Sequence, residues 1–416
     1  MADRNDKPPC DPANAAETSA QGAVEKIEHG TPAFLRTNLA LFAAGFATFA
    51  LLYCVQPLMP LFSADFGVSA AGASLALSAS TGVLAVFMLI TGPLSDIWGR
   101  KPIMVAALLL SSALTILCAT LQHWPALLLA RALMGITLSG LPAVAMAYVG
   151  EEMHPRSLGL AMGLYIGGSA IGGMSGRLLT GVITDIAGWR IAMTVIGVLG
   201  ALCGAILWRS LPRSRHFTPR EPRVAQLIQS FSANLRDPVL SILFAEGFLL
   251  MGSFVTIYNY VGYRLMAPPF SLSQTAIGLI FSVYLSGIVS SACMGALSGR
   301  LGRLPVIVAA LVLMLAGLAT TLLSQLWLII FGIVVLTFGF FGAHTVVSAW
   351  IGARARHGKG QASSLYLFAY YMGSSAVGSL GGLFWSAAGW GGVIAMTGAL
   401  VLAALAMTLR LKSRSA

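Results

Sequence analysis

Long apolar runs separated by short polar turns fill the chain from about residue 37 onward. Each run is about 20 residues long, the length that an α-helix needs to cross the hydrocarbon core of a bilayer. The runs lack the alternation of period two that marks the strands of a membrane barrel, so helices remain as the way to satisfy every backbone group in lipid. We therefore predict an all-α membrane protein with twelve transmembrane helices, at 37–60, 74–95, 102–120, 124–149, 158–181, 190–208, 239–263, 275–297, 304–322, 326–350, 361–385 and 391–410.

One polar turn occurs twice. The segment from Gly92 to Pro102 returns 203 residues later as Gly295 to Pro305, and each copy closes an apolar run. Further matches at similar offsets support a duplication: Gln122 and Trp124 with Gln325 and Trp327, and Tyr165, Gly167 and Ser169 with Tyr371, Gly373 and Ser375. Such repeats are common among secondary transporters, whose two parallel halves enclose a central site. We predict two six-helix bundles at 37–208 and 239–411, a cytoplasmic linker at 209–238, a disordered cytoplasmic tail at 1–36 and a short tail at 412–416.

Composition and charge agree with a membrane protein. Hydrophobic residues make up 57% of the chain and charged residues only 9%, against about 25% charged residues in an average soluble domain. With both termini in the cytoplasm, 21 of the 25 Lys and Arg residues fall on the inner side, as the positive-inside rule requires. The net charge of +11 then faces anionic lipid headgroups, and no nucleic acid is needed to explain it. The scattered cysteines suggest neither a disulfide framework nor a metal site.

The first copy of the turn carries a recognisable motif. Its residues Gly92, Asp96, Gly99, Arg100 and Lys101 closely resemble the loop signature of the major facilitator superfamily. The segments 53–57 and 360–366 resemble the bacterial drug and sugar efflux branch of that superfamily. The resemblance runs from about residue 33 to residue 411. It implies the major facilitator fold and transport by alternating access between the two halves.

Asp96 is the most informative charge of this motif. It lies at the C-terminal end of the second span, where the helix dipole disfavours an anion, so a carboxylate there needs a positive partner. The N-terminus of the eleventh span, near Gly360, opens on the same face and could supply one. In the family this aspartate is an intracellular latch between the halves, and the resemblance implies that role for Asp96. We expect Gly99 to form the tight turn and Arg100 and Lys101 to hold the loop at the headgroups; the alternative is a solvated loop acid.

Glycines recur along the fifth span at the spacing of a helix face. Close packing against a neighbouring helix is the expected role of these glycines: Gly159, Gly163, Gly168, Gly172 and Gly176. They also resemble the family's antiporter motif, which implies exchange of solute for protons. Gly173 and Arg177 stand where that motif has proline and glycine, so plain packing remains an alternative reading.

Two charged residues inside spans are candidates for proton coupling. Arg131 lies in the fourth span, where a charge costs about 2.5–3.5 kcal/mol, and it matches a family motif in which an arginine is tied to coupling. Its alternative role is a structural tether to the carbonyls of a neighbouring helix. Glu246 lies in the seventh span, where loss of water favours a neutral carboxyl group. The alternative for Glu246 is a shallow acid that reaches water or pairs with Arg236.

Spans one, seven and ten line the cavity in this fold, and polar residues on them are candidates for contact with the solute. We expect the following residues at the cavity: Tyr53, Gln56, Tyr165, Tyr258, Asn259, His344, Tyr366 and Tyr370. Such a pocket, aromatic and with few fixed charges, suits a neutral or weakly amphiphilic solute. Four other charged residues are expected at the external surface: Arg177, Asp185, Arg190 and Arg264.

The leading functional hypothesis is proton-coupled efflux of a small organic solute, a drug or a sugar, across the bacterial inner membrane by a monomer. No ATP-binding loop is present, so the proton gradient is the expected energy source, without a cofactor. A proton-coupled importer of the same fold is the nearest alternative. A membrane-embedded enzyme would need clustered catalytic side chains, and a non-transporting scaffold would not need charges inside its spans; we expect neither.

Overall fold

The computed structural model describes residues 26–216, 224–355 and 358–415, and almost all of them are helical. The first half of the chain forms α2 (Pro32–Tyr53), α3 (Met59–Phe66), α4 (Ala70–Trp98), α5 (Arg100–Thr120), α6 (Trp124–Leu138), α7 (Pro142–Glu152), α8 (Pro155–Ala187) and α9 (Trp189–Ser210). The second half forms α10 (Val224–Arg236), α11 (Pro238–Met266), α12 (Gln274–Ile280), the 3₁₀ turn η1 (Phe281–Val283), α13 (Tyr284–Leu301), α14 (Arg303–Thr320), α15 (Leu326–Arg354) and α16 (Lys359–Ser415).

The helices account for the twelve predicted membrane crossings. Eleven helical stretches of the described residues are long and apolar enough to span a membrane, counting α6 with α7 and α12 with α13 as one span each. The longest stretch, α16, breaks at Ala388 and Gly389, whose backbone is not helical. Its two limbs therefore cross separately, which gives twelve crossings and confirms the all-α architecture.

The duplicated turn has the same backbone conformation in both halves. Gly99 joins α4 to α5 with φ 88° and ψ 156°, and Gly302 joins α13 to α14 with φ 86° and ψ 163°. Only glycine adopts a positive φ of this kind without strain. Each glycine is followed three residues later by a proline, Pro102 or Pro305, within the first turn of the next helix, where the missing N–H costs nothing. The repeat inferred from the sequence is therefore a structural repeat.

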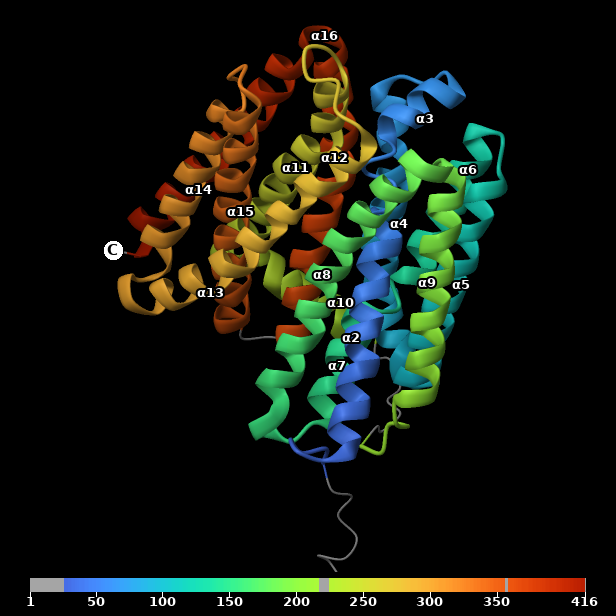
Figure 1. Ribbon diagram of the computed structural model, residues 1–416. Coiled ribbons are helices and arrows are strands. Elements are labelled where there is room, and N and C mark those ends of the chain that lie inside the picture. Colours follow the sequence, from blue (N-terminus) through green and yellow to red (C-terminus); the bar gives the residue numbers. More distant parts are fainter. Residues whose placement is uncertain (1–25, 217–223, 356–357, 416) are drawn as a thin grey trace, which may run out of the picture.

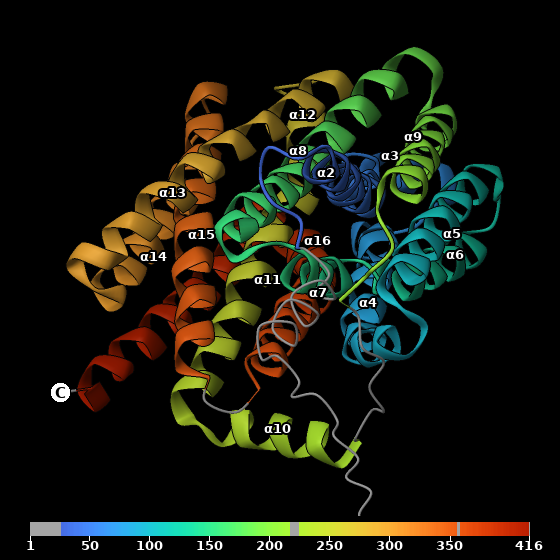
Figure 2. The ribbon, with the colours of Figure 1, turned by 90° about the horizontal axis from the view of Figure 1, so that it is seen from below.

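Two helical bundles stand side by side in Figure 1, α2–α9 in one and α11–α16 in the other. The helix α10 lies across one end of the molecule, next to α11 and α16 (Figure 2). We call this end the α10 side and the opposite end, which carries α3 and the break in α16, the α3 side. The bundles meet where α4 packs against α16 and where α8 packs against α12.

The two halves are joined by hydrogen bonds in the middle of the molecule and on its α3 side. The bonded pairs are Gln56 with Asn259, Ser63 and Met59 with Tyr263, Ser78 with Ser375, and Asp185 with Gln274 and Thr275. Toward the α10 side the same helices carry glycines with open space around them. A Cβ atom added to Gly92 of α4, Gly159 or Gly163 of α8, or Gly360 of α16 would meet no atom of the described residues within 4 Å.

The first helix begins earlier in the chain than the predicted boundary between the N-terminal tail and the first span. The first helix begins at Pro32, not at residue 37, because Thr31 caps it by accepting a hydrogen bond from the Phe34 amide and proline suits the first turn. Ile27 is also ordered, since it pairs with α7 through the Glu152 carbonyl and the His154 amide. Within the linker predicted at 209–238, α10 is a helix. Residues 1–25, and residues 217–223 of the linker, lie outside the described part of the chain.

Candidate functional site

Arg131 is fully buried and ties together three helices of the first half. Its guanidinium group donates to the carbonyls of Leu51 and Leu52 in α2, at 3.1 and 2.6 Å, and to Ala76 in α4 at 2.7 Å. None of the carboxylates that the structure describes forms an ion pair with it. These contacts match the tether that the sequence left open as the alternative to a coupling role.

The end of α2 explains why a cation is needed there. The helix stops at Tyr53 because Pro57, four residues on, lacks the N–H that would bond to the Tyr53 carbonyl. Residues 54–58 form turns instead, and the Gln56 amide bonds to Tyr53 at 3.0 Å rather than to Leu52. The carbonyls of the last helical turn are therefore left for Arg131, whose positive charge also suits a helix C-terminus. This turn places Gln56 between the two halves.

Gln56 connects a buried arginine of α8 to an asparagine of α11. Nε of Arg177 donates to Oε1 of Gln56 at 2.7 Å, and Nε2 of Gln56 donates to Oδ1 of Asn259 at 2.7 Å. All three side chains are at most 2% exposed. Two of the eight predicted cavity residues are thus brought into direct contact across the interface between the halves.

The prediction that Arg177 lies at the external surface is wrong. Its side chain is 1% exposed, and its guanidinium carbon lies 4.3 Å from the ring centre of Tyr53, 5.0 Å from Phe281 and 4.8 Å from Tyr284. The error came from ending the fifth span at residue 181, whereas α8 continues to Ala187. At 1.5 Å per residue, Arg177 lies about 15 Å inside the end of that helix. The sequence did contain a signal for this position, because Arg177 replaces the last glycine of the antiporter motif that the glycines of α8 resemble.

Three more of the predicted cavity residues form an aromatic cluster in the second half. Nδ1 of His344 lies 2.7 Å from the Tyr366 hydroxyl oxygen, and its ring centre lies 4.9 Å from that of Tyr370. The Tyr366 ring packs against Gly247, where an added Cβ would approach to 2.5 Å. Because Gly247 follows Glu246 in α11, this cluster adjoins the candidate coupling acid.

Glu246 is buried between α11 and α16, with 1% of its surface exposed. Its Oε1 accepts a hydrogen bond of 2.5 Å from the Thr408 hydroxyl, and its Oε2 has no partner among the described residues. It does not pair with Arg236, which lies in α10. The alternative of a shallow, paired acid is therefore wrong, because the carboxyl group lies against the second limb of α16 and not in water.

The remaining two cavity candidates make no hydrogen bond to Gln56, Asn259 or the His344 cluster within the described residues. Tyr258 is in the core of the second half, where its hydroxyl bonds to that of Thr337 at 2.7 Å and its ring stacks on Phe281 at 5.3 Å. Tyr165 of α8 is buried with no hydrogen-bond partner for its hydroxyl among the described residues. Its carbonyl would lie 2.7 Å from a Cβ at Gly45 of α2, so α2 and α8 are close here.

The stripe of small residues on α8 is shorter than predicted. Gly168, Gly172 and Gly176 lie against α2, where an added Cβ would come within 2.6 Å of Phe42, 2.0 Å of Phe46 and 2.6 Å of Ala50, respectively. Gly159 and Gly163 do not take part, because nothing described lies within 4 Å of a Cβ there. At about 100° per residue, these two glycines lie roughly half a turn around α8 from Gly168, so they face away from α2.

The duplicated turn holds an ion-pair network within the first half, in which the arginine is buried and the two carboxylates are partly exposed. Nη2 of Arg100 lies 2.6 Å from Oδ1 of Asp96 and 2.7 Å from Oε1 of Glu151, and Nη1 of Arg100 donates to the Ser95 hydroxyl. Arg100 is 7% exposed, so the prediction that it holds the loop at the headgroups is wrong. Glu151 was missed because its proximity depends on how α7 packs against α4 and α5. The Asp96 carboxylate is paired inside its own half in this conformation.

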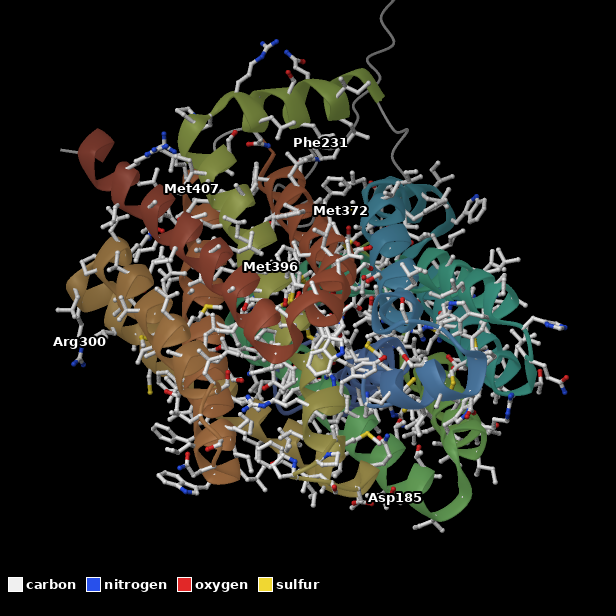
Figure 3. All side chains as sticks on the ribbon, turned by 90° about the horizontal axis from the view of Figure 1, so that it is seen from above. Asp185, Phe231, Arg300, Met372, Met396 and Met407 are labelled. Carbon is white, nitrogen blue, oxygen red and sulfur yellow. The ribbon has the colours of Figure 1, made fainter. Side chains whose placement is uncertain are left out.

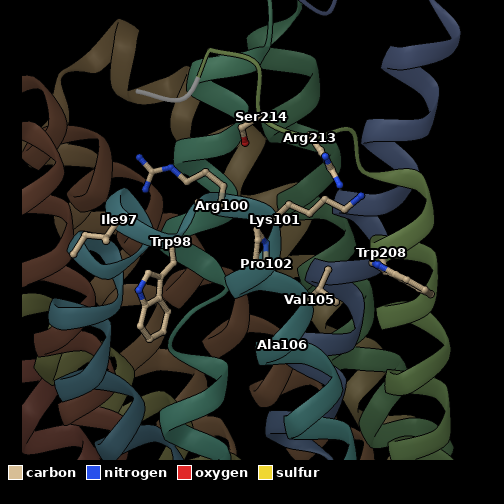
Figure 4. A pocket seen from close by; sticks show the side chains of 11 residues that line it. Ile97, Trp98, Arg100, Lys101, Pro102, Val105, Ala106, Trp208, Arg213 and Ser214 are labelled. Carbon is tan, nitrogen blue, oxygen red and sulfur yellow. The ribbon is translucent and has the colours of Figure 1, made fainter. Parts of the chain in front are cut away.

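Lys101 does face the outside of the bundle. It lines a groove of about 670 Å³ together with Trp98, Trp208 and Arg213. Lys101 and Arg213 point toward one another in Figure 4, and the Lys101 ammonium group donates to the Leu211 carbonyl at 2.5 Å. Exposed tryptophans beside basic residues are typical of the membrane–water interface.

Three charged residues lie at the α3-side ends of helices, and each satisfies backbone groups. Asp185 lies where α8 meets α12 (Figure 3), and it accepts hydrogen bonds from the Gln274 and Thr275 amides at 3.1 and 2.7 Å. Arg190 donates to the carbonyls of α5's last turn and the loop after it. Arg264 donates to carbonyls of the loop after α14.

Comparison with known proteins agrees with this architecture. Residues 41–270 and 247–416 match the model of the Major Facilitator Superfamily. The chain is 51% identical over 407 residues to the inner membrane transport protein YnfM of Escherichia coli (strain K12), covering 97% of this chain and 98% of that protein. It is 48% identical over 379 residues to the uncharacterized MFS-type transporter YybF of Bacillus subtilis (strain 168), covering 91% of this chain and 94% of that protein.

A solved structure shares the fold at low sequence identity. It is a bacterial homolog of the human lysosomal transporter Spinster in an inward-facing, occupied conformation. The TM-score is 0.75 at 17% identity, over 91% of this chain and 96% of that one. Together with the family match over nearly the whole sequence, these findings identify the chain as a member of the major facilitator superfamily.

Proposed function

We propose that this protein exports a small organic solute across the bacterial inner membrane in exchange for protons, by alternating access and as a monomer. The observation that carries this proposal is Glu246, a carboxyl group buried in the second half with one hydroxyl partner and no cationic partner among the described residues. The energy source is the proton gradient, and no cofactor is required.

The α10 side faces the cytoplasm in this proposal. Basic residues gather at the ends of helices there, including Lys101, Arg213, Arg303 and Arg354, and cytoplasmic loops carry such an excess of Lys and Arg. Both termini of the helical region then lie in the cytoplasm. A relative at 51% identity carries the name inner membrane transport protein, which supports the same location.

Alternating access follows from where the halves touch. Hydrogen bonds join them on the α3 side, while helix ends on the α10 side have open space beside Gly92 and Gly360. This conformation is therefore the inward-facing state of the proposal. Rocking one half against the other would part the α3-side contacts and bring the α10-side ends together.

Glu246 is the proton site in this proposal. An ionised carboxylate at 1% exposure without a cation would lose its hydration with little compensation, so the neutral acid suits the conformation described here. Tyr366 and His344 are hydrogen-bonded to each other beside this acid, and in this conformation neither is hydrogen-bonded to Glu246 within the described residues. Every guanidinium nitrogen of Arg131 donates to a backbone carbonyl, and Nη1 also donates to the Met134 sulfur, so we assign Arg131 no part in coupling.

We propose export rather than import because of the glycines of α8. Gly168, Gly172 and Gly176 keep the close packing of the antiporter-type pattern, while Gly173 and Arg177 depart from it. Import coupled to protons uses the same fold and the same acid, so the direction must be measured.

The test is flux in proteoliposomes loaded with a pH-sensitive dye, with a panel of sugars, aromatic carboxylates and drug-like cations on one side. For a coupled solute, wild-type protein should move protons opposite to the solute. Glu246→Gln keeps the size of the side chain and its contact with Thr408 but cannot release a proton. This variant should lose gradient-driven flux and keep solute-for-solute counterflow.

Asp65→Asn is the matched control, because Asp65 is an exposed acid of α3 that should not affect coupling. Gradient-driven flux that persists in Glu246→Gln would remove Glu246 as the proton site. Proton movement in the same direction as the solute would establish import. No flux of any solute in wild-type vesicles would favour the scaffold hypothesis.

A further inference from the structure

Two buried arginines of the first half differ in how their donors are used. Arg131 directs all three of its guanidinium nitrogens at acceptors of α2, α4 and α6. Arg177 uses only two: Nε bonds to Gln56, and Nη1 bonds to the Gly173 carbonyl at 2.6 Å. Its Nη2 donates to no group in the described part of the chain, and no carboxylate lies within ion-pair distance. Arg131 is thus a satisfied tether, whereas Arg177 retains unused donors.

The amide groups beside Arg177 add another unused donor. Because Nε of Arg177 can only donate, Oε1 of Gln56 must face it, and Nε2 of Gln56 must then donate to Oδ1 of Asn259. This order leaves Nδ2 of Asn259, which is buried and bonds to none of the residues that the structure describes. The network therefore contains a cation and a surplus of N–H donors, with no anion to accept from them.

The rings around Arg177 come from both halves. Tyr53 belongs to α2, while Phe281 and Tyr284 belong to the η1–α13 region, and all three ring centres lie within about 5 Å of the guanidinium carbon. The guanidinium group lies over these rings, so a group bound to it would touch residues of both halves at once.

We propose that the transported solute is an organic anion whose carboxylate binds Arg177, with an aromatic or flat apolar body that packs against Tyr53 and Tyr284. The carboxylate supplies the charge that the buried guanidinium lacks, through the bidentate geometry that arginine favours. Asn259, from the other half, offers a further donor. This assignment rests on the proposed function, since it names the solute of that transporter, and it replaces the neutral solute expected from the sequence.

The test is a melting-temperature assay of the full-length protein in detergent, in the absence of any proton gradient. The probes are matched pairs of a carboxylate and its uncharged amide: benzoate and benzamide, phenylacetate and phenylacetamide, cinnamate and cinnamamide. At least one carboxylate should stabilise the wild-type protein, and its amide should not. In Arg177→Gln the dissociation constant of that carboxylate should rise about 30-fold or more, as for the loss of one partner of a buried charge pair.

Two further variants keep the test decisive. Arg177→Lys retains the charge without the fork of donors, so it should bind more weakly than wild type and more tightly than Arg177→Gln. Arg190→Gln removes an arginine at the α3-side surface and should bind as wild type does. A monodisperse elution profile confirms that each variant is folded; if Arg177→Gln is not, Arg177→Lys carries the comparison.

The assignment is overturned if no carboxylate stabilises the wild type more than its amide, if stabilisation survives in Arg177→Gln, or if sodium chloride at equal concentration has the same effect. Because binding is measured without a gradient, its outcome is independent of Glu246. If a carboxylate binds but no proton-coupled flux is found, the proposal of proton coupling is wrong and the anion site stands. If an uncharged solute is transported with protons, the anion site is wrong and proton coupling stands.

Discussion

Gln56 and Asn259 are hydrogen-bonded to each other at 2.7 Å and are separated by 203 residues of sequence. The bond joins the turn after α2 to α11 across the interface between the halves, and Arg177 of α8 lies beside it through Gln56.

Gly172 is expected to be the most sensitive glycine of α8. In Gly172→Ala the new Cβ would lie 2.0 Å from the Phe46 carbonyl oxygen, so α2 and α8 must separate, at a cost of about 1–3 kcal/mol. The melting temperature in detergent should fall. Gly163→Ala is the control: nothing lies within 4 Å of its Cβ, and alanine favours a helix, so melting should be unchanged or slightly higher. Equal effects of both variants would contradict the packing described here.

Arg131 is expected to matter for stability and not for coupling. Arg131→Leu would leave the carbonyls of Leu51, Leu52 and Ala76 without their partner, at about 1–3 kcal/mol for each buried group. A large loss of folded protein should follow. Arg131→Lys should melt lower than wild type while keeping the ratio of protons to solute. A lysine variant with wild-type melting but without proton coupling would restore the coupling hypothesis for Arg131.

Asp96 is expected to favour the outward-facing state as a latch to the N-terminus of α16. In the conformation described here the carboxylate pairs with Arg100 of its own half at 2.6 Å, and it forms no ion pair with a described residue of the other half. Asp96→Asn removes the charge that a helix N-terminus would stabilise by about 0.3–1 kcal/mol. The outward-facing population should therefore fall, as measured by spin-label distances on the α3 side. Asp96→Glu should restore part of it; identical populations in wild type and Asp96→Asn would exclude the latch.

Asp237 is expected to stabilise α11 in a pH-dependent way. Burial alone would raise the pKa of Asp237, but the Leu240 and Val239 amides and the Arg354 guanidinium outweigh it and hold the pKa below its usual value. A carboxylate with a lowered pKa stabilises the fold above its unfolded pKa of about 3.9, and that contribution is lost as the pH falls through the folded pKa.

The measurement is the difference in melting temperature between wild type and two variants at neutral and acidic pH. Asp237→Ala should cost about 1 kcal/mol for the lost helix cap. Asp237→Asn keeps the cap and should lose only the partly exposed ion pair, about 0.2–1 kcal/mol. Both differences should shrink at acidic pH, and a difference that grows on acidification would contradict the assignment.

The fold could be predicted from the sequence because its determinants are local. Bilayer thickness fixes the length of each apolar run, and the repeated glycine turn fixes where two of the runs reverse. The start of α2 was less predictable, because the helix begins at Pro32, with Thr31 as its cap, within a polar segment whose composition is typical of a disordered tail.

The sequence predicted polar residues at the interface between the halves but not the contacts that they make. Gln56 and Asn259 were predicted as cavity residues of spans one and seven, and the bond between them depends on how the halves pack. Arg177 was misplaced because an arginine near the predicted end of a span resembles a surface anchor. Whether Arg131 is a tether or a coupling residue depends on carbonyls of two other helices, which no spacing within α6 reveals.

The central claim is that the halves open alternately on the two sides. Distances between spin labels on α4 and on the first limb of α16 test this claim most directly. These helices cross with Gly382 against Ala71, and each has one end on either side. In a cysteine-free background, spin labels on Ser69→Cys with Ala387→Cys report the α3 side, and labels on Ile97→Cys with Lys359→Cys report the α10 side. Distances are compared at acidic and basic pH, with and without a solute that the flux assay has identified. We predict that the two distances change in opposite directions, the α10-side pair closing as the α3-side pair opens; two distances that stay fixed, or that change together, would contradict alternating access.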